Sequence, residues 1–168
     1  RIQDAATMVG ILTDRYQVTG DIQDMMNAAG LVEFLLKQQG EDGGYYRNGK
    51  IHYTSVIYLA KSIMEYLVCA KGLAMNYPEW KNRYNRHLES VNRALDDLAR
   101  RGDNVQTEGE MTFEDGMIGC SATQLAMGAL RASDKLTREK YKKASLFLTD
   151  KHRCLTLLKM PDSRMRGA

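Results

Sequence analysis

The prediction of the fold class depends first on the stretch QQGEDGGYYRNGKIHYTS, Gln38 to Ser55, because it separates two long segments of helical periodicity. A plain turn between two helices needs only a few residues. This connection is longer, and it combines glycines, carboxylates, tyrosines and a histidine. Its length and its chemistry predict a loop with a function of its own, held between two helices.

Helical periodicity extends upstream of this loop. Helices are predicted over residues 2–16 and 22–39, with Asp21 as the N-cap of the second and Gly40 as its stop. The apolar stripe predicted for the first helix comprises Ile2, Ala5, Ala6, Val9, Leu12 and Tyr16, and that for the second comprises Met25, Met26, Ala29, Val32, Leu35 and Leu36.

Downstream of the loop, residues 54–76 are apolar on most sides, which predicts a largely buried helix. Pro78 suits the start of the next helix, which has a wide charged face and is expected to be an outer helix with an exposed His87. Helices over residues 120–132 and 137–158 follow a second long loop. Since no β-type alternation stands out, the prediction is an all-α chain of three helical hairpins, in which apolar inner helices alternate with charged outer ones.

The two long loops share a sequence pattern. GEDGGYY leads to YTSVIYLAKSI, and FEDGM leads to GCSATQLAMGAL. In both, Glu-Asp-Gly precedes a small hydroxyl residue that opens the next helix, Ser55 or Ser121, and Leu-Ala follows four residues later. The pattern predicts an array of hairpins, although Glu-Asp-Gly is also common turn chemistry.

Composition narrows the function classes. The 168 residues fit one domain or a piece of a larger one, and 43% hydrophobic with 27% charged residues predicts a globular chain. A net charge of +3 gives no footprint for nucleic acid, and the apolar runs are too short to predict a membrane span. Cys69, Cys120 and Cys154 lack CxxC spacing and are expected to be buried free thiols.

A family resemblance rests on four stretches. QGEDGGY, Gln39 to Tyr45, resembles the Gln-x-x-Asp-Gly-Gly-aromatic turn common in α/α toroids. HYTSVIYLAKSIMEYL, FEDGMIGCSATQLAMGAL and HRCLTLLKMPDSRMRGA are similar to the α/α-toroid domain of bacterial YetA-like rhamnogalacturonan exolyases, polysaccharide lyase family 26. The similarity runs from about residue 20 to the end of the chain. It implies a six-hairpin-like toroid, of which residues 1–168 would be a partial domain that needs the remainder of its own polypeptide.

The resemblance also implies a function. Such a lyase acts by β-elimination on acidic pectic polysaccharide, so the expected partner is an acidic polysaccharide or oligosaccharide, and a periplasmic or secreted location is expected. No cofactor is implied, and the use of a divalent metal stays open. Two alternatives remain: a glycoside hydrolase with the same toroid and paired carboxylates, and a non-catalytic helical-repeat scaffold. The scaffold is favoured by the lack of any GxSxG, HExxH or P-loop pattern.

The expected catalytic residues lie in the two long loops. His52 and Tyr53 suit the base and acid of a proton abstraction, although a packed aromatic beside a solvent-facing histidine is the alternative. Glu114 and Asp115 would have raised pKa values if their loop enters the apolar interior, or would cap a turn. The two loops are expected to open on one side of the domain, with His52, Tyr53 and Glu114 facing a shared groove.

The expected substrate-binding residues are aromatic or basic. Tyr45 and Tyr46 offer ring faces and hydroxyls to a sugar, and Lys61 either points into the cavity or extends to the surface. Arginine suits bidentate binding of a uronate carboxylate. The basic set near the end of the chain comprises His152, Arg153 and Arg164. Glu41 and Asp42 are expected to cap the turn rather than to act in catalysis.

Overall fold

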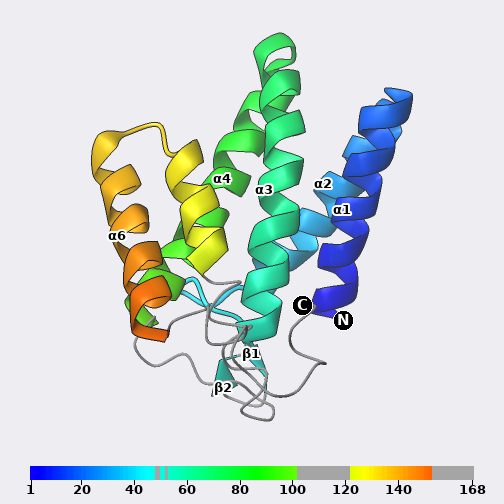
Figure 1. The fold of residues 1–168 in the computed structure, drawn as a ribbon. Helices are drawn as coiled ribbons and strands as arrows, with labels where there is room; N and C mark the ends of the chain where they lie inside the picture. Colours follow the sequence, from blue (N-terminus) through cyan, green and yellow to red (C-terminus); the bar gives the residue numbers. More distant parts are fainter. Residues whose placement is uncertain (48–49, 52, 102–121, 153–168) are drawn as a thin grey trace, which may run out of the picture. The chain divides into compact units, whose positions relative to one another are not determined.

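The computed structural model describes residues 1–47, 50–51, 53–101 and 122–152 (Figure 1). The chain divides into two compact units, Arg1–Ala94 and Leu95–Ala168. Apart from turns and one short pair of strands, the described residues of both units are helical, which confirms the all-α prediction. The expectation of one partial toroid domain over residues 1–168 stays a prediction.

The first unit begins with α1, Ile2–Thr19. Its predicted apolar stripe is confirmed at Ala5, Ala6, Val9 and Leu12, which are buried. The helix ends at Gly20, whose φ of 71° is in the left-handed region that favours glycine, and the Gly20 backbone N–H donates to the Tyr16 carbonyl. This cap places the end of α1 three residues beyond the predicted one.

The second helix, α2, spans Ile22–Gln38. Asp21 is its N-cap as predicted, because the Asp21 carboxylate accepts a hydrogen bond from the Gln23 backbone N–H at 3.0 Å. The buried face comprises Asp24, Met25, Ala28, Ala29, Val32 and Leu35. Burial of Met26 was a wrong expectation: its side chain is 41% exposed, since one residue along a helix turns it by about 100° away from Met25.

The long loop after α2 contains a feature that the sequence pattern did not predict. The strands β1, Tyr46–Arg47, and β2, Lys50–Ile51, pair antiparallel in the register Tyr46↔Ile51 and Arg47↔Lys50. A two-residue ladder has no apolar alternation to reveal it. It gives the loop a hairpin at the point where the chain leaves the turn and approaches α3.

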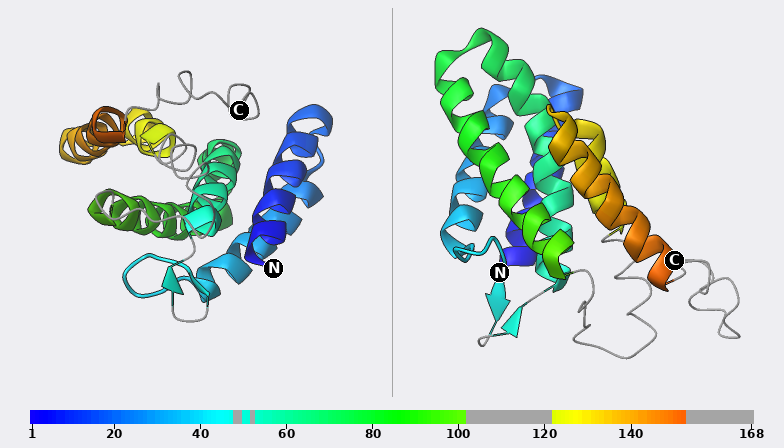
Figure 2. Two further views of the ribbon diagram at one scale, coloured as in Figure 1. Left: turned by 60° about the horizontal axis from the view of Figure 1, so that its bottom comes forward. Right: turned by 90° about the vertical axis from the view of Figure 1, so that its left-hand side faces the viewer.

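Two long helices follow this loop: α3, Tyr53–Asn76, and α4, Pro78–Arg101, which begins in the first unit. Pro78 occupies the first position of α4 as predicted, and the Tyr77 backbone N–H before it closes the end of α3 on the Leu73 carbonyl at 2.9 Å. Within the first unit α1 packs along both α2 and α3 (Figure 2). The expectation that α3 is more buried than α4 stays a prediction, because the side chains of residues 53–61 lie outside the described ones.

The second unit contains the end of α4, a helix over residues 122–131, and α6, Lys135–His152. The Asp134 carboxylate caps α6 by accepting from the Thr137 backbone N–H at 2.8 Å, so the helix begins two residues before the predicted start. Ser145 of α6 donates its hydroxyl to the Ala122 carbonyl at 2.7 Å, and Leu125, Tyr141 and Leu148 are buried. Among the three cysteines, Cys69 is described: it is a half-buried free thiol, while Cys120 and Cys154 lie outside the described residues.

Candidate functional site

The turn over residues 39–45 is fixed to α4 by the side chain of Gln39. Its Nε2 donates to the Gly43 carbonyl at 2.9 Å and to the Ser90 carbonyl at 3.0 Å. Its Oε1 accepts from the Ser90 hydroxyl at 2.6 Å and from the Arg93 guanidinium at 2.9 Å. The Gln39 amide therefore forms hydrogen bonds with polar groups of both the turn and α4, and it connects the end of α2 to the middle of α4.

Gly43 lets the turn approach the α4 backbone closely. Its φ is 89°, and a Cβ placed on it would lie 2.2 Å from the Arg93 carbonyl oxygen. Side-chain atoms cannot approach a backbone oxygen that closely, so the position accepts only glycine. The Gly40 backbone N–H donates to the Gly44 carbonyl at 2.8 Å, and the Gly43 N–H donates to the Gly40 carbonyl at 2.9 Å, which closes the turn.

Asp42 serves this turn in the way that Asp-Gly-Gly predicts. Its Oδ1 accepts from the Gly44 backbone N–H at 3.0 Å, and its Oδ2 accepts from the Tyr46 hydroxyl. Tyr46 itself is exposed and begins β1, so its ring is available to solvent. The carboxylate thus connects the turn to the first residue of the hairpin that follows.

Tyr45 is fully buried beneath the turn. Burial raises the pKa of its phenol, and the Arg93 cation opposes that shift only in part. The substrate-binding role expected for Tyr45 needs an accessible ring, which a fully buried one does not offer. Among the two tyrosines, Tyr46 is therefore the one that can contact a ligand directly.

The other expected site residues are placed by their backbone or lie outside the structure's description. His52, Glu114, Asp115, Arg153 and Arg164 lie outside the described residues. Tyr53 and Lys61 lie in the first three turns of α3, and His152 is the last residue of α6, but their side chains are not among the described ones. The shared groove expected for His52, Tyr53 and Glu114 therefore stays a prediction.

His87 corrects an expectation, because its side chain is fully buried rather than exposed. It shares a helical face with Trp80, Val91, Ala94 and Leu98, all of which are also buried. The spacing of these residues matches one stripe of a helix. The wide charged face of α4 led to the expectation that His87 is exposed. The sequence feature that indicates the buried stripe is a recurrence at intervals of seven residues, at Trp80, His87 and Ala94.

A hydrogen-bonded chain connects three helices through this histidine. Glu33 of α2 contacts His87 Nε2 with its Oε1 at 2.7 Å, and the Tyr66 hydroxyl of α3 contacts His87 Nδ1 at 3.1 Å. The Tyr66 ring also lies 6.4 Å from the Trp80 ring centroid, and the Arg83 guanidinium stacks over Trp80 at 4.5 Å. We call Glu33, Tyr66 and His87 the buried polar chain.

The electrostatics of the buried polar chain fix its protonation. Burial lowers the pKa of His87, although the neighbouring Glu33 carboxylate opposes this shift. Partial burial opposes ionisation of Glu33, but hydrogen bonds from His87 and Arg86 outweigh it and hold the pKa of that carboxyl below its usual value. An ionised Glu33 only accepts hydrogen bonds, so neutral His87 donates from Nε2 to Glu33 and accepts a hydrogen bond from the Tyr66 hydroxyl at Nδ1.

This arrangement is a brace rather than a reactive centre. A glutamate, a histidine and a tyrosine that are hydrogen-bonded in a row can transfer a proton when the tyrosine hydroxyl contacts a substrate. The Tyr66 side chain is fully buried, however, and burial raises the pKa of its phenol well above the usual value. The chain therefore holds α2, α3 and α4 together by satisfying polar groups inside the first unit.

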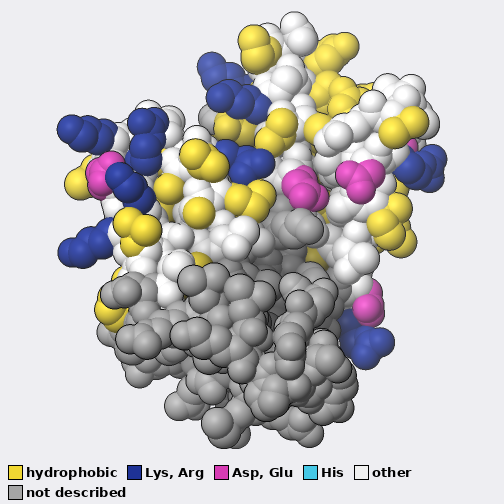
Figure 3. Space-filling model, viewed as in Figure 1, with side chains coloured by type: hydrophobic (Ala, Val, Ile, Leu, Met, Phe, Trp, Pro, Cys, Tyr) yellow, Lys and Arg dark blue, Asp and Glu magenta, His cyan; other side chains and the backbone are white. Residues whose placement is uncertain are grey.

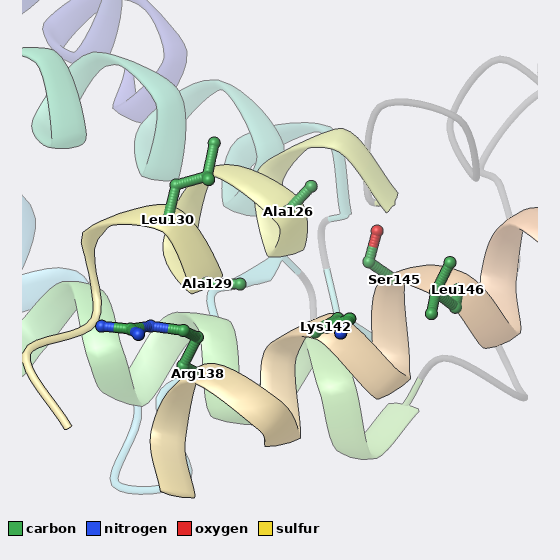
Figure 4. Close-up of a pocket in the computed structure, with 7 residues that line it drawn as sticks. All are labelled: Ala126, Ala129, Leu130, Arg138, Lys142, Ser145 and Leu146. Carbon is green, nitrogen blue, oxygen red and sulfur yellow. The ribbon is translucent and has the colours of Figure 1, made fainter. Parts of the chain in front are cut away.

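The second unit has a groove between the helix over residues 122–131 and α6, with a volume of about 560 Å³. Figure 4 shows side chains from both helices around it. We call it the α6 groove, and its lining residues are Ala126, Ala129, Leu130, Arg138, Lys142, Ser145 and Leu146. Its floor is apolar, while two cations lie one helical turn apart on α6.

Neither a metal centre nor a membrane helix emerges from the described residues. They contain no cluster of three or more His, Cys, Asp or Glu side chains able to hold a metal ion. The helices in the described ranges also include none with the length and apolar character required to cross a membrane. Comparison of the chain with family models, with curated proteins and with solved structures gives no match.

Proposed function

We propose that the chain forms part of an α/α toroid in a bacterial polysaccharide lyase, which acts by β-elimination on acidic, rhamnogalacturonan-like pectic polysaccharide. The observation that carries the proposal is the turn over residues 39–45. Its Gln, Asp and two Gly residues each have a distinct structural role in it. This is the turn whose sequence, QGEDGGY, resembles that of α/α toroids.

The turn supports a functional loop physically. Gln39 and Gly43 fix it against α4, and Asp42 connects it to the hairpin of β1 and β2. His52 and Tyr53 follow β2 directly and lead into α3. Binding and catalytic residues concentrate on loops that a rigid scaffold positions, and this loop has such a scaffold at both ends.

The chemistry of the elimination assigns roles to the expected site residues. A base, His52 or Tyr53, removes the proton from the carbon beside the uronate carboxylate, and the electron pair forms a double bond as the neighbouring carbon–oxygen bond breaks. The other residue of the pair protonates the departing oxygen. Cations, proposed as Lys61, His152, Arg153 and Arg164, hold the carboxylate and stabilise its enolate-like form. Tyr46 offers a ring face to a sugar, and Glu114 and Asp115 complete the proposed site.

The substrate defines the proposed partner and setting. An acidic polysaccharide or oligosaccharide is the ligand, with further hairpins of the same polypeptide completing the ring. Polymeric pectin lies outside the cell, so the enzyme acts in the periplasm or after secretion. We propose no cofactor for this reaction.

Product absorbance tests the reaction class. The intact protein is incubated with rhamnogalacturonan, and ultraviolet absorbance is followed together with the release of reducing ends. A lyase raises both, because elimination leaves an unsaturated uronate. Reducing ends without absorbance would show a glycoside hydrolase instead, and neither signal on acidic pectic substrates would support a non-catalytic scaffold.

A further inference from the structure

Arg93 differs from the other basic side chains of α4 in its partners. Lys and Arg side chains are spread over several helices on the face drawn in Figure 3, so an exposed cation does not by itself mark a site. The other arginines of α4 with described side chains each have a charged or aromatic partner: Arg83 lies over Trp80, Arg86 pairs with Glu33, and Arg100 pairs with Asp97. The exposed Arg93 instead donates to the neutral amide of Gln39, and it has no ion-pair partner in the part of the chain that the structure describes.

The carboxylates near Arg93 in sequence and in the turn do not neutralise it. Glu89 and Asp97 lie one helical turn before and after it on α4, a spacing at which ion pairs form. The Asp97 carboxylate pairs with Arg100 instead. Glu89, like Glu41 of the turn, is exposed and forms no ion pair with any described residue. The Arg93 guanidinium therefore keeps its charge and most of its N–H donors available for a ligand.

Gln39 fixes the position of this guanidinium. Arg93 Nη2 donates to Gln39 Oε1 at 2.9 Å, and the same amide is held by the Gly43 carbonyl and by the carbonyl and hydroxyl of Ser90. The backbone is fixed as well, because Gly43 packs against the Arg93 carbonyl oxygen. A side chain that is held in advance loses less conformational freedom when a ligand binds. Arg93 is therefore pre-organised to bind an anion.

An exposed aromatic ring lies at the same turn. The Tyr46 side chain is 41% exposed, and its Cε2 atom lies 3.0 Å from the Cβ position of Gly40, the residue that follows Gln39. The Tyr46 hydroxyl donates to Asp42, whose other carboxylate oxygen accepts from the turn backbone, so the ring is held in place. An aromatic face supports a sugar ring, and a guanidinium binds a carboxylate through two parallel hydrogen bonds. The turn thus carries the two groups that recognise an acidic sugar.

We propose that Arg93 is a specificity-determining residue, which binds the carboxylate of a uronate next to the one that reacts, while Tyr46 supports the ring of that sugar. The inference rests on the proposed function for its substrate class. An acidic polysaccharide carries more than one uronate, so Arg93 and the cations assigned to the reacting carboxylate bind different sugars. The contact is equally strong before and during the elimination, so Arg93 acts on substrate affinity rather than on turnover.

Equilibrium binding tests this role separately from the reaction. The intact protein with His52→Ala and Tyr53→Phe, which should not consume the ligand, is titrated by calorimetry with a rhamnogalacturonan oligosaccharide and with the same oligosaccharide after reduction of its carboxylates to alcohols. This parent should bind the acidic form at least about tenfold more tightly than the reduced form. Adding Arg93→Gln should weaken binding of the acidic form at least about tenfold and leave the reduced form unchanged, which also shows that the variant is folded.

Arg86→Gln is the matched control. Arg86 is an exposed arginine on the same helix, but Glu33 already pairs with it, so this variant should bind both forms like the parent. Equal weakening by Arg93→Gln and Arg86→Gln would overturn the inference, because only the net charge would then matter. Weakening of the acidic and reduced forms alike by Arg93→Gln, or no binding of the acidic form by the parent, would also overturn it.

The two proposals fail in different ways. If the wild type forms the unsaturated product but Arg93→Gln binds the acidic form like its parent, the role of Arg93 is wrong and the reaction stands. If no unsaturated product forms but the preference for the acidic form depends on Arg93, the carboxylate site stands and the reaction is wrong.

Discussion

At the scale of single residues, Gly43 is the glycine with the closest contact at its Cβ position among those that the structure describes. Its positive φ and the Arg93 carbonyl oxygen both exclude a side chain. We expect Gly43→Ala to lower the free energy of unfolding by more than about 2 kcal/mol, because the turn must move off α4. Urea denaturation of both proteins measures the difference.

Gly20 provides the control for this prediction. It also has a positive φ, 71°, but nothing lies within 4 Å of the position that a Cβ would take. Gly20→Ala should therefore show the backbone cost alone, about 1 kcal/mol. Equal losses for the two variants would mean that the contact with Arg93 has no role in stability.

His87 makes stability depend on pH. Its pKa is lower in the folded protein than in the unfolded chain, so the unfolded chain binds a proton first as pH decreases. The stability contributed by neutral His87 is present above the unfolded value of about 6.5 and is lost as pH falls below it. The stability contributed by ionised Glu33 is present above the unfolded value of 4.5 and is lost only as pH falls below it, because the pKa of this carboxyl is lowered in the folded protein.

The measurement compares wild type with His87→Gln between pH 7.5 and pH 5, by urea denaturation at each pH. Wild type should lose more free energy of unfolding over this range than the variant, since glutamine does not titrate. The difference isolates His87 from His52 and His152, which both proteins retain. Parallel pH profiles would show that the buried polar chain does not control the titration.

At the scale of elements, the turn over residues 39–45 is held to α4 by the side-chain amide of Gln39. Gln39 makes four hydrogen bonds to the turn and α4, and truncation removes the part-buried bonds that Ser90 and Gly43 make to its side chain. Gln39→Ala should cost about 2–3 kcal/mol in the free energy of unfolding. Gln38→Ala, at the exposed neighbouring position, should stay within about 0.5 kcal/mol of wild type.

Hydrogen exchange gives the same prediction a spatial test. Loss of the Gln39 contacts should raise exchange at the backbone amides of Gly40, Gly43 and Gly44, which form or support the turn. The amides of α1 should keep their protection, because α1 does not contact Gln39 through any of these bonds. Uniform loss of protection across the first unit would mean that the turn is not a separate structural feature.

At the scale of the whole molecule, local chemistry was predictable and tertiary placement was not. Asp21 and Pro78 marked helix starts because caps and breakers act within one turn of the chain. Gly40 was predicted to stop α2, but the helix ends at Gln38 and its C-cap is Gln39. Burial of His87 depends on Glu33 and Tyr66, which are distant in sequence, so the charged composition of α4 gave the opposite expectation. Exposure of Tyr46 beside buried Tyr45 likewise depends on α4, against which the turn is packed.

In the candidate site, too, the local features were predictable from the sequence and the tertiary contacts were not. The sequence pattern located the turn and the loop that follows it, because Gly-rich and Asx chemistry is local. It assigned a ligand-binding role to Tyr45 by residue type alone, and the structure shows that this ring is in the core. The buried polar chain and the α6 groove could not be predicted from the sequence. Each is formed by helices that are separate in sequence, so only the three-dimensional structure shows them.

We propose that the loop after this turn performs β-elimination, and the turnover of His52→Ala and Tyr53→Phe tests this most directly. Both variants are made in the intact protein and assayed by the absorbance of the unsaturated product, with stability measured alongside. Proton transfer by a placed side chain contributes about 10²–10⁴-fold, so turnover should fall by that order for at least one variant while the free energy of unfolding stays within about 1 kcal/mol of wild type. Losses below about tenfold for both variants, with the protein still folded, would contradict the account.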